Sequence, residues 1–230
     1  MRADHASGVW SAHARPVATH RILIVGAGGF GREVLLWARD TWPEHASQIA
    51  GFLAADDPAS KSLPNRLPIL ASPLAYEPEP DDLLLLAIGI PRTRRAVAES
   101  LLSKGARFLT LVHPTAILAP SATIGIGAIV CPFSIVSDAA RVGHFALLNY
   151  HSSLGHDASV GDYAVLSPYA ALGGNARVED DVFMGIHATV GPGRRIGARS
   201  KVSANSCALA DSPPDSIIFG APGRVAPLIT

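Results

Sequence analysis

A six-residue repeat in the second half of the chain constrains the fold more than any other feature. Fifteen consecutive hexads carry a large aliphatic residue or methionine at one position, from Leu118 to Val202, and the last hexad ends at Cys207. The residue four places later is small in every hexad except two, which have Val182 and Arg194 there. A period of six fits neither an α-helix nor a single strand, so it must come from a larger repeating coil.

A left-handed parallel β-helix built from hexapeptide repeats accounts for this pattern. One large side chain per hexad fills the centre of a three-sided prism, the small residue fits the tight corner, and three hexads complete one coil. Residues eighteen apart then lie one above the other at the spacing between strands, about 4.8 Å. We therefore expect five coils over residues 118–207, within a prism domain of residues 113–230.

The residues before the prism predict a small Rossmann-like α/β domain over residues 21–112, after a flexible extension over residues 1–20. A buried strand at 21–25 leads into the turn Gly26-Ala27-Gly28-Gly29-Phe30-Gly31 and then a helix, which is the order of a phosphate-binding βα unit. Further strands are expected at 49–53, 83–88 and 107–112, and a second helix at 93–104. Such a sheet is about half of a full dinucleotide fold, so we expect it to hold a mononucleotide. Alternatively, the glycines serve only tight packing in the turn.

Charge and hydropathy argue against several classes of function. Lysine plus arginine equals aspartate plus glutamate at 19 each, which leaves no electrostatic footprint for nucleic acid. No apolar run is long enough to cross a bilayer and no signal-peptide pattern is visible, so we expect a cytoplasmic protein without membrane insertion. Cys131 and Cys207 are expected four coils apart on the same face, at roughly 19 Å, which predicts free thiols.

Many outward positions of the prism are apolar, and patches of this size are uncommon on monomers. This pattern predicts a homo-oligomer, and threefold closure suits the shape of a prism. The residues concerned are Ile126, Phe133, Ile135, Leu147, Tyr150, Tyr163, Val165, Tyr169 and Phe183.

The hexad that contains His156 and Asp157 is the strongest candidate for chemistry. Histidine changes charge near neutral pH, so it can act as a general base without large tuning. The eighteen-residue register places Gly174 over His156, where an exposed N–H could stabilise an oxyanion. It places Asp138 directly below, so either Asp157 or Asp138 could orient the imidazole. Together these groups are the minimum apparatus for acyl transfer.

Three motifs together resemble a known family. The run I-V-G-A-G-G-F-G-R-E at 24–33, the H-D pair at 156–157 and the run F-G-A-P-G-R at 219–224 resemble the sialic acid O-acetyltransferase (NeuD-like) and bacillosamine N-acetyltransferase (PglD-like) group. The resemblance covers the chain from Arg21 onward. It implies a homotrimer that uses acetyl-coenzyme A (acetyl-CoA) to acetylate a nucleotide-linked amino sugar at its amine, with O-acetylation of a sugar as the alternative.

The resemblance also implies roles for individual residues. His156 looks like the general base, assisted by Asp157, and Gly174 would donate to the thioester carbonyl. Asn149 matches an asparagine seven residues before the base. The nucleotide-sugar pocket would be formed by Gly26, Gly28, Gly29, Phe30, Gly31, Asp56 and Asp57, and the coenzyme would lie near Gly174, Gly191, Gly220, Ala221 and Pro222.

Two departures from the family pattern stand out. Several members have glutamate where this chain has the shorter Asp157, which leaves open whether Asp157 or Asp138 contacts the imidazole. Some relatives have a histidine nine residues after the base, where this chain has Val165. Part of the contact to the acceptor or the coenzyme must therefore differ.

Two other functions are weaker alternatives. A zinc site like that of γ-class carbonic anhydrases is suggested by the five-residue separation of His151 and His156, but the third ligand position holds Thr115. His151 and His187 are expected in one column about Tyr169, near 10 Å apart, too far to share a metal within one chain, so no metal is expected. The second alternative is a non-enzymatic scaffold whose front domain senses a nucleotide.

Overall fold

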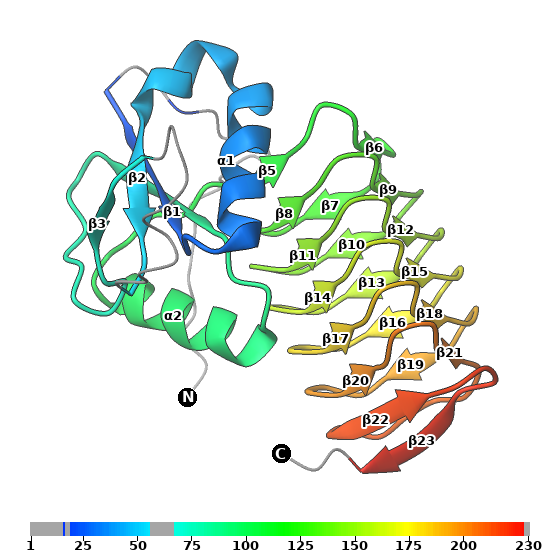
Figure 1. Cartoon of the computed structure of the whole chain (residues 1–230). Coiled ribbons are helices and arrows are strands. Elements are labelled where there is room, and N and C mark those ends of the chain that lie inside the picture. The colour runs from blue at the N-terminus through cyan, green and yellow to red at the C-terminus, as the bar shows by residue number, and fades with distance from the viewer. Residues whose placement is uncertain (1–15, 17–18, 56–66, 228–230) are drawn as a thin grey trace.

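The computed structural model describes residues 16, 19–55 and 67–227 of the chain. A small α/β domain lies against one side of a tall triangular prism (Figure 1). The predicted fold class, a Rossmann-like domain followed by a left-handed parallel β-helix, is confirmed. Most of the predicted extension over residues 1–20 lies outside the described residues.

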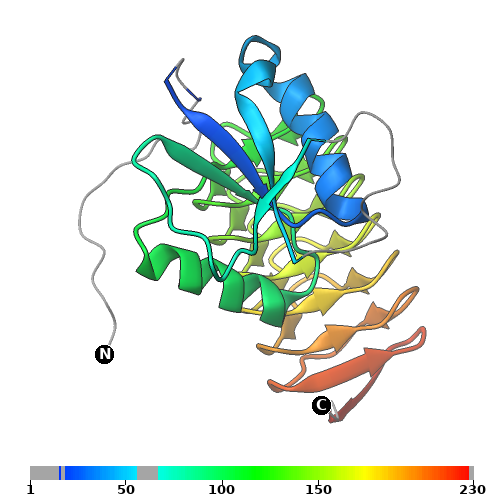
Figure 2. The same ribbon diagram turned by 60° about the vertical axis from the view of Figure 1, so that its left-hand side comes forward.

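The N-terminal domain is a four-stranded parallel sheet with its helices packed against it (Figure 2). The strand order is β3-β2-β1-β4. The elements are β1 (Arg21–Val25), α1 (Gly29–Thr41), the 3-10 helix η1 (Pro43–Gln48), β2 (Ile49–Leu53), β3 (Ile69–Ala71), β4 (Asp82–Leu86) and α2 (Pro91–Ser103). The short strand β3, with its partly exposed side chains, was not predicted because it has no buried apolar run.

The prism has three parallel sheets, which we name by their surroundings. The covered face lies against the N-terminal domain, whereas the open face points away from it (Figure 1). The arginine face carries Arg141, Arg177 and Arg195 on its surface. The covered face consists of β5 (Leu111–Val112), β8 (Ile129–Val130), β11 (Leu147–Leu148), β14 (Val165–Leu166), β17 (Phe183–Met184), β20 (Lys201–Val202), β22 (Ser216–Phe219) and β23 (Arg224–Pro227). The open face consists of β6 (Ile117–Leu118), β9 (Ile135–Val136), β12 (Ser153–Leu154), β15 (Ala171–Leu172), β18 (Thr189–Val190) and β21 (Cys207–Ala208). The arginine face consists of β7 (Thr123–Ile124), β10 (Arg141–Val142), β13 (Ser159–Val160), β16 (Arg177–Val178) and β19 (Arg195–Ile196).

Every strand of the repeat pairs with the strand eighteen residues away, as predicted. Leu148, for example, pairs with Val130 on one side and Leu166 on the other. The large residue of each hexad and the small corner residue together form one continuous core. At the turn of each corner the chain repeatedly adopts a left-handed backbone conformation, as at Asp157 (φ 59°) and Asn175 (φ 58°).

The boundary between the two domains runs through the segment that was expected to be a single strand at 107–112. Phe108 forms a bridge to Leu84 in the N-terminal sheet, whereas Leu111 pairs with Ile129 of the prism. The first strand of the prism, β5, therefore begins before the first regular hexad. It lies beneath α1, and Leu111 is fully buried.

The expectation that all outward apolar residues need a partner chain is wrong for part of the set. Leu147, Val165 and Tyr163 are almost fully buried, because α1 and α2 of the same chain lie over the covered face and the adjoining corner. Tyr150 and Phe183 also pack against this interface. In contrast, Ile126, Phe133, Ile135 and Tyr169 remain exposed.

The two cysteines are free thiols, as predicted, but they do not lie on the same face. Cys131 follows β8 and is buried beneath the N-terminal domain, whereas Cys207 begins β21 on the open face. Their separation of 76 residues is not a multiple of eighteen, which places them on different faces. Within the described residues, no helix has the length and hydropathy needed to cross a membrane.

Candidate active site

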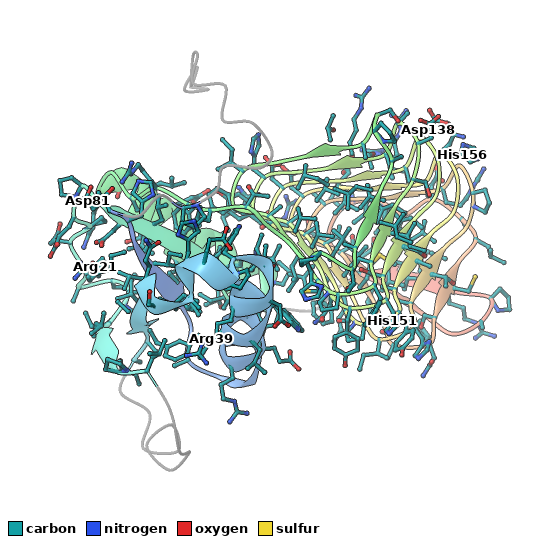
Figure 3. All side chains as sticks on the ribbon, turned by 90° about the horizontal axis from the view of Figure 1, so that it is seen from above. Arg21, Arg39, Asp81, Asp138, His151 and His156 are labelled. Atoms are coloured by element: carbon teal, nitrogen blue, oxygen red, sulfur yellow. The ribbon has the colours of Figure 1, made fainter. Side chains whose placement is uncertain are left out.

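His156 lies at the corner between the open and arginine faces, which we call the His156 corner. The view along the prism shows His156 and Asp138 at the edge farthest from the N-terminal domain (Figure 3). The His156 Nδ1 lies 2.9 Å from a carboxylate oxygen of Asp157. A carboxylate only accepts, so Nδ1 carries the proton and Nε2 keeps a free lone pair. Both side chains are more than half exposed to solvent.

Gly174 lies directly over His156, as the register predicted. A Cβ at residue 174 would lie 2.5 Å from the His156 Nε2, so any side chain there would collide with the imidazole. The N–H of the next residue, Asn175, donates to the His156 carbonyl at 2.8 Å and fixes the stacking. The N–H of Gly174 itself makes no hydrogen bond to any described residue. The imidazole Nε2 therefore lies against the backbone of Gly174, a residue whose N–H is not used by any other described residue. A base and an unused backbone donor on adjacent rungs are the groups that acyl transfer needs.

Asp138 stacks below but does not contact the imidazole. Its carboxylate accepts a hydrogen bond from the Ser121 hydroxyl, and its backbone carbonyl accepts one from the Asp157 N–H. Of the two candidates, Asp157 is therefore the residue that holds the His156 ring in this structure. The shorter aspartate reaches the ring because it occupies the turn of the corner next to His156.

The structure does not bring Asn149 to His156. Asn149 lies at the corner between the covered and open faces, and the whole of β12 separates the two residues. Its side-chain oxygen accepts a hydrogen bond from the Tyr150 N–H, and its carbonyl accepts from the Ser134 and Ser152 hydroxyls. Within one chain, Asn149 therefore forms hydrogen bonds only at its own corner and does not contact His156.

The residues expected near the coenzyme share one side of the prism. Gly191 follows β18 of the open face, one rung above Gly173. The Gly220-Ala221-Pro222 turn joins β22 to β23 and folds against the last strand of the same face, where the Cys207 N–H donates to the Gly220 carbonyl. The three sites thus follow one side of the prism from Gly174 toward its end, although Gly191 itself is buried beside Leu209.

The glycine turn after β1 contains two kinds of glycine. Gly26 (φ 112°) and Gly31 have no room for a side chain, because a Cβ would lie 2.5 Å from the Ala87 carbonyl and 2.0 Å from the Gly26 carbonyl, respectively. Gly28 has no atom within 4 Å of its Cβ direction, and Gly29 has only one arginine side-chain atom there. Gly26 and Gly31 therefore serve packing, whereas Gly28 and Gly29 face open space at the N-terminus of α1. Phe30 packs against Trp37 on the same helix.

Gly89 was not singled out from the sequence, although it completes this crevice. It lies in the turn between β4 and α2 and also faces open space. The strands β1 and β4 are neighbours at the point where the strand order reverses, and ligands of open α/β sheets bind outside the carboxyl ends of strands at such a point. The signal was present as Gly89 followed by Pro91 at a helix start. Asp56 and Asp57, the predicted acidic pair, lie outside the described residues.

Arg94 was also missed, and it connects the crevice to the prism. Its fully buried guanidinium donates to the carbonyls of Leu86 and Ile88 at 2.7 and 2.9 Å, and to the Phe145 carbonyl of the prism at 2.5 Å. Burial lowers the pKa of Arg94 to about 9. A buried arginine without a carboxylate partner leaves no pattern in the sequence.

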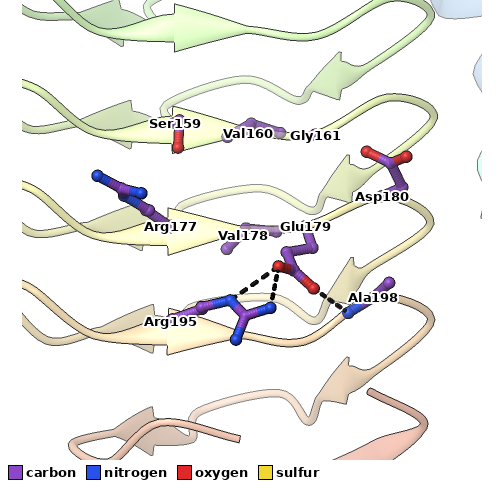
Figure 4. A pocket seen from close by; sticks show the side chains of 9 residues that line it. All are labelled: Ser159, Val160, Gly161, Arg177, Val178, Glu179, Asp180, Arg195 and Ala198. Atoms are coloured by element: carbon purple, nitrogen blue, oxygen red, sulfur yellow. Dashed lines mark hydrogen bonds and ion pairs between the residues drawn. The ribbon is translucent and has the colours of Figure 1, made fainter. Parts of the chain in front are cut away.

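A shallow hollow of about 400 Å³ lies on the arginine face, next to the His156 corner (Figure 4). Its lining includes Ser159, Arg177, Glu179 and Arg195, but neither His156 nor Gly174. The Glu179 carboxylate pairs with Arg195 across it and also accepts from the Ala198 N–H at 2.9 Å. The hollow contains no histidine or other group suited to act as a base near neutral pH, so we place the chemistry at His156.

The remaining histidines lie elsewhere. His151, Tyr169 and His187 stack in one column, as predicted, at the corner between the covered and open faces. His151 and His156 are therefore on different corners and cannot bind one zinc ion within a chain. Among the described residues, no group of three histidine, cysteine, aspartate or glutamate side chains is arranged to hold a metal.

The sequence matches a known family model and, over a shorter stretch, a curated relative. The model described as the PglD N-terminal domain matches residues 21–101. A UDP-N-acetylbacillosamine N-acetyltransferase from Bacillus subtilis (strain 168) is 43% identical over 51 residues, which is 22% of this chain and 24% of that protein. The match thus spans about a quarter of the relative's length.

Solved structures match nearly the whole chain. WeeI from Acinetobacter baumannii AYE has a TM-score of 0.81 and 25% identity, over 90% of this chain and all of its own. PerB from Caulobacter crescentus, in complex with CoA and GDP-perosamine, has a TM-score of 0.76 and 25% identity, over 91% and 98% of the two chains. The acetyltransferase domain of PglB from Neisseria gonorrhoeae FA1090 has a TM-score of 0.79 at 24% identity, over 89% and 98%, which shows a shared fold.

Proposed function

The chain belongs to the NeuD/PglD-like family, and on that premise we propose that it transfers an acetyl group from acetyl-CoA to the amine of a nucleotide-linked amino sugar. The observation that carries the proposal is the contact of the His156 Nε2 with the bare backbone of Gly174. CoA and GDP-perosamine, the ligands of PerB, are a pair of this chemical kind. Acetylation of a sugar hydroxyl is the alternative.

His156 acts as the general base in this proposal. Its Nε2 takes a proton from the acceptor amine as the nitrogen attacks the thioester carbonyl carbon. Asp157, hydrogen-bonded to Nδ1, keeps the ring in the required tautomer and stabilises the imidazolium that forms. The proton on Nε2 then passes to the departing sulfur, so the products are an amide and a free thiol.

Gly174 stabilises the intermediate between these steps. When the amine attacks, the carbonyl oxygen becomes an oxyanion, and we assign the unused Gly174 N–H as the group that donates to it. As the C–S bond breaks, that charge returns to the carbonyl. No side chain acts as a nucleophile, and no covalent enzyme intermediate is needed.

The acceptor would be held by the crevice at the carboxyl ends of β1 and β4. Gly28, Gly29 and Gly89 leave backbone groups open there, and the N-terminus of α1 favours a phosphate. We include Asp56 and Asp57 in the pocket on the resemblance alone. The coenzyme would lie along Gly174, Gly191 and the Gly220-Ala221-Pro222 turn.

A homotrimer is part of the proposal, because one chain does not bring its own two sites together. The N-terminal domain lies on the covered face, whereas His156 lies at the opposite corner of the prism (Figure 3). His156 and Asp157 are also mostly exposed for a catalytic pair. A neighbouring copy that brings its crevice to this corner would supply the acceptor and exclude water. We place the enzyme in the cytoplasm, where acetyl-CoA is available.

The test is thiol release from acetyl-CoA with a panel of nucleotide-linked amino sugars. One acceptor should support turnover, and His156→Ala should lower kcat/KM at least about a hundredfold. His144→Ala, an exposed histidine at another corner, is the matched control and should retain full turnover. Treating the product with neutral hydroxylamine separates the two chemistries, because an ester is cleaved and an amide is not. Full activity in His156→Ala would overturn the assignment.

A further inference from the structure

One fully buried side chain, Arg94, holds the turn between β4 and α2. Its Nη1 donates to the carbonyls of Leu86 and Ile88 at the end of β4, at 2.7 and 2.9 Å. Its Nε donates to the carbonyl of Phe145, in a turn of the prism, at 2.5 Å. The three acceptors belong to two domains. Arg94 therefore fixes the shape of the turn and also its place on the prism.

The peptide groups that accept from Arg94 present their N–H groups on the opposite side. In a trans peptide the C=O and the N–H point in opposite directions, and both peptides at this turn are trans. The first of them shows where that opposite side lies. The Leu86 carbonyl accepts from Arg94, and the Ala87 N–H of the same peptide donates to the Val25 carbonyl of β1 at 2.8 Å. The side away from Arg94 is therefore the side of β1 and its glycine turn.

The second peptide, between Ile88 and Gly89, ends in a donor without a partner. Its carbonyl accepts from the same Arg94 nitrogen, so the Gly89 N–H is also directed away from Arg94. This N–H makes no hydrogen bond to any described residue, and the space beside Gly89 is open. On the other side of the crevice, α1 begins at Gly29 without a side-chain cap, so its first N–H groups lack partners as well. Unused backbone donors thus border the crevice on two sides.

The buried charge of Arg94 favours an anion at this place. Within the part of the chain that the structure describes, no carboxylate forms an ion pair with Arg94, and its Nη2 is buried without a hydrogen-bond partner. A buried charge without a counter-ion is costly. A phosphate beyond the turn would supply the opposite charge, and the attraction is strong where water is excluded between them.

We propose that Arg94 is a positioning residue for the acceptor: it turns the Gly89 N–H into the crevice, where this N–H donates to a phosphate of the bound nucleotide. The inference rests on the proposed function, which assigns the nucleotide-linked sugar to this crevice. Arg94 does not touch the ligand and acts only through the turn. Its loss should therefore weaken binding of the nucleotide and leave the steps at His156 unchanged.

Calorimetric titration of the full chain with UDP, GDP and dTDP tests the inference. Arg94→Lys keeps the charge, but a single ammonium in place of the planar fork cannot reach carbonyls in both domains. Its affinity for the nucleotide that binds the wild type should fall at least about tenfold. Arg95→Ala is the control, because Arg95 is the next residue on α2 but pairs with Asp181, and it should bind like the wild type. Circular dichroism at the temperature of titration checks that each variant is folded.

Two variants at residue 89 test the same donor without disturbing Arg94. Gly89→Pro removes the N–H, whereas Gly89→Ala keeps it and also adds a Cβ, which meets no atom within 4 Å. The comparison between them isolates the hydrogen bond. Gly89→Pro should bind the nucleotide about tenfold or more weakly than Gly89→Ala.

Steady-state kinetics separate positioning from a general loss of structure. With the nucleotide-linked sugar that supports turnover, Arg94→Lys should raise KM for that acceptor about tenfold, and kcat and the KM for acetyl-CoA should stay within about twofold of the wild type. A purely structural defect would instead lower kcat, because fewer molecules are active, and would leave both KM values unchanged.

Each outcome decides between the inference and the function on which it rests. Equal nucleotide affinity in the wild type, Arg94→Lys and Gly89→Pro would overturn the role of Arg94 alone. A wild type that binds none of the three nucleotides would overturn that role together with the proposed acceptor crevice. Nucleotide binding that depends on Arg94, without acetyl transfer to any acceptor, would support the inference and refute the proposed enzyme activity.

Discussion

The corner between the arginine and covered faces, which lies under the N-terminal domain and which we call the docked corner, is built from the same hexapeptide unit as the His156 corner. The two corners nevertheless differ in burial, polarity and contacts. At the docked corner, turn residues such as Phe145 and Tyr163 are buried by the N-terminal domain and held by Arg94 and Arg95. At the His156 corner the turn residues, Asp157 and Asn175 among them, are polar or small and exposed. The backbone conformation at the turn is nearly identical, with φ close to 58° at both.

This difference shows that the core of a coil and the contacts of its corners are determined by different positions of the hexad. The inward residues are alike at every rung and only hold the stack together. The residue at the turn decides whether a corner is covered by the N-terminal domain, as at Tyr163, or is left exposed, as at Asp157. Substitutions at the docked corner should therefore change stability, and substitutions at the His156 corner should change activity.

The largest expected effect is on stability, from Arg94→Met at the docked corner. Loss of the guanidinium leaves the carbonyls of Leu86, Ile88 and Phe145 without a buried donor, which should lower the free energy of unfolding by about 3 kcal/mol. Denaturant unfolding measures this. Arg95→Ala is the control, since its partly exposed pair with Asp181 should contribute about 1 kcal/mol or less. If the Arg94→Met protein were as stable as the wild type, the cost of burying the Arg94 charge would equal the stabilisation from its hydrogen bonds.

The second effect is confined to activity, from Gly174→Ala at the His156 corner. The new methyl group would displace the imidazole, which is exposed enough to swing away at little cost in stability. We expect kcat to fall about a hundredfold or more, with loss of both the base and the oxyanion donor. The melting temperature should change little. Asn175→Gly, at the same rung, relieves a left-handed backbone and should keep wild-type turnover; a normal rate in Gly174→Ala would remove Gly174 from the site.

The smallest expected effect is a loss of stability at alkaline pH, caused by ionisation of Tyr163. Burial disfavours the phenolate and raises the pKa of Tyr163 to about 12. A raised folded-state pKa contributes stability that is present below the unfolded value near 10 and is lost as the pH rises toward 12. The wild type should therefore lose on the order of 1 kcal/mol more than Tyr163→Phe between pH 8 and 11. Denaturant unfolding of the two proteins at both pH values measures this difference. Equal losses in the free energy of unfolding would mean that the Tyr163 ring is open to water.

The prism could be predicted almost rung by rung, because its period is a property of the sequence alone. The same register predicts from the sequence alone that Gly174 lies over His156. It did not choose between Asp138 and Asp157, since a column assignment carries no side-chain direction. The contact to Asp157 depends on the left-handed turn at that residue.

Features that join the two domains could not be predicted in the same way. Leu147 and Val165 look like partner-binding residues from the repeat, and nothing in their spacing shows that α1 lies over them. Arg94 is one of several arginines in a helix, and its burial follows only from the packing of α2 on Phe145. Tertiary contacts between units of different period leave no periodic trace in the sequence.

The strict pairing of rungs also limits how this protein can change in length. An insertion or deletion within the prism that is not a multiple of six residues would move core side chains out of register, and one of six or twelve residues would shift every later column to another face, whereas eighteen residues added or removed would leave every rung matched. Each whole coil gained between the N-terminal domain and His156 would move the His156 corner about 4.8 Å along the prism. The number of coils therefore acts as a spacer in discrete steps, setting the height of His156 relative to the crevice at the carboxyl ends of β1 and β4.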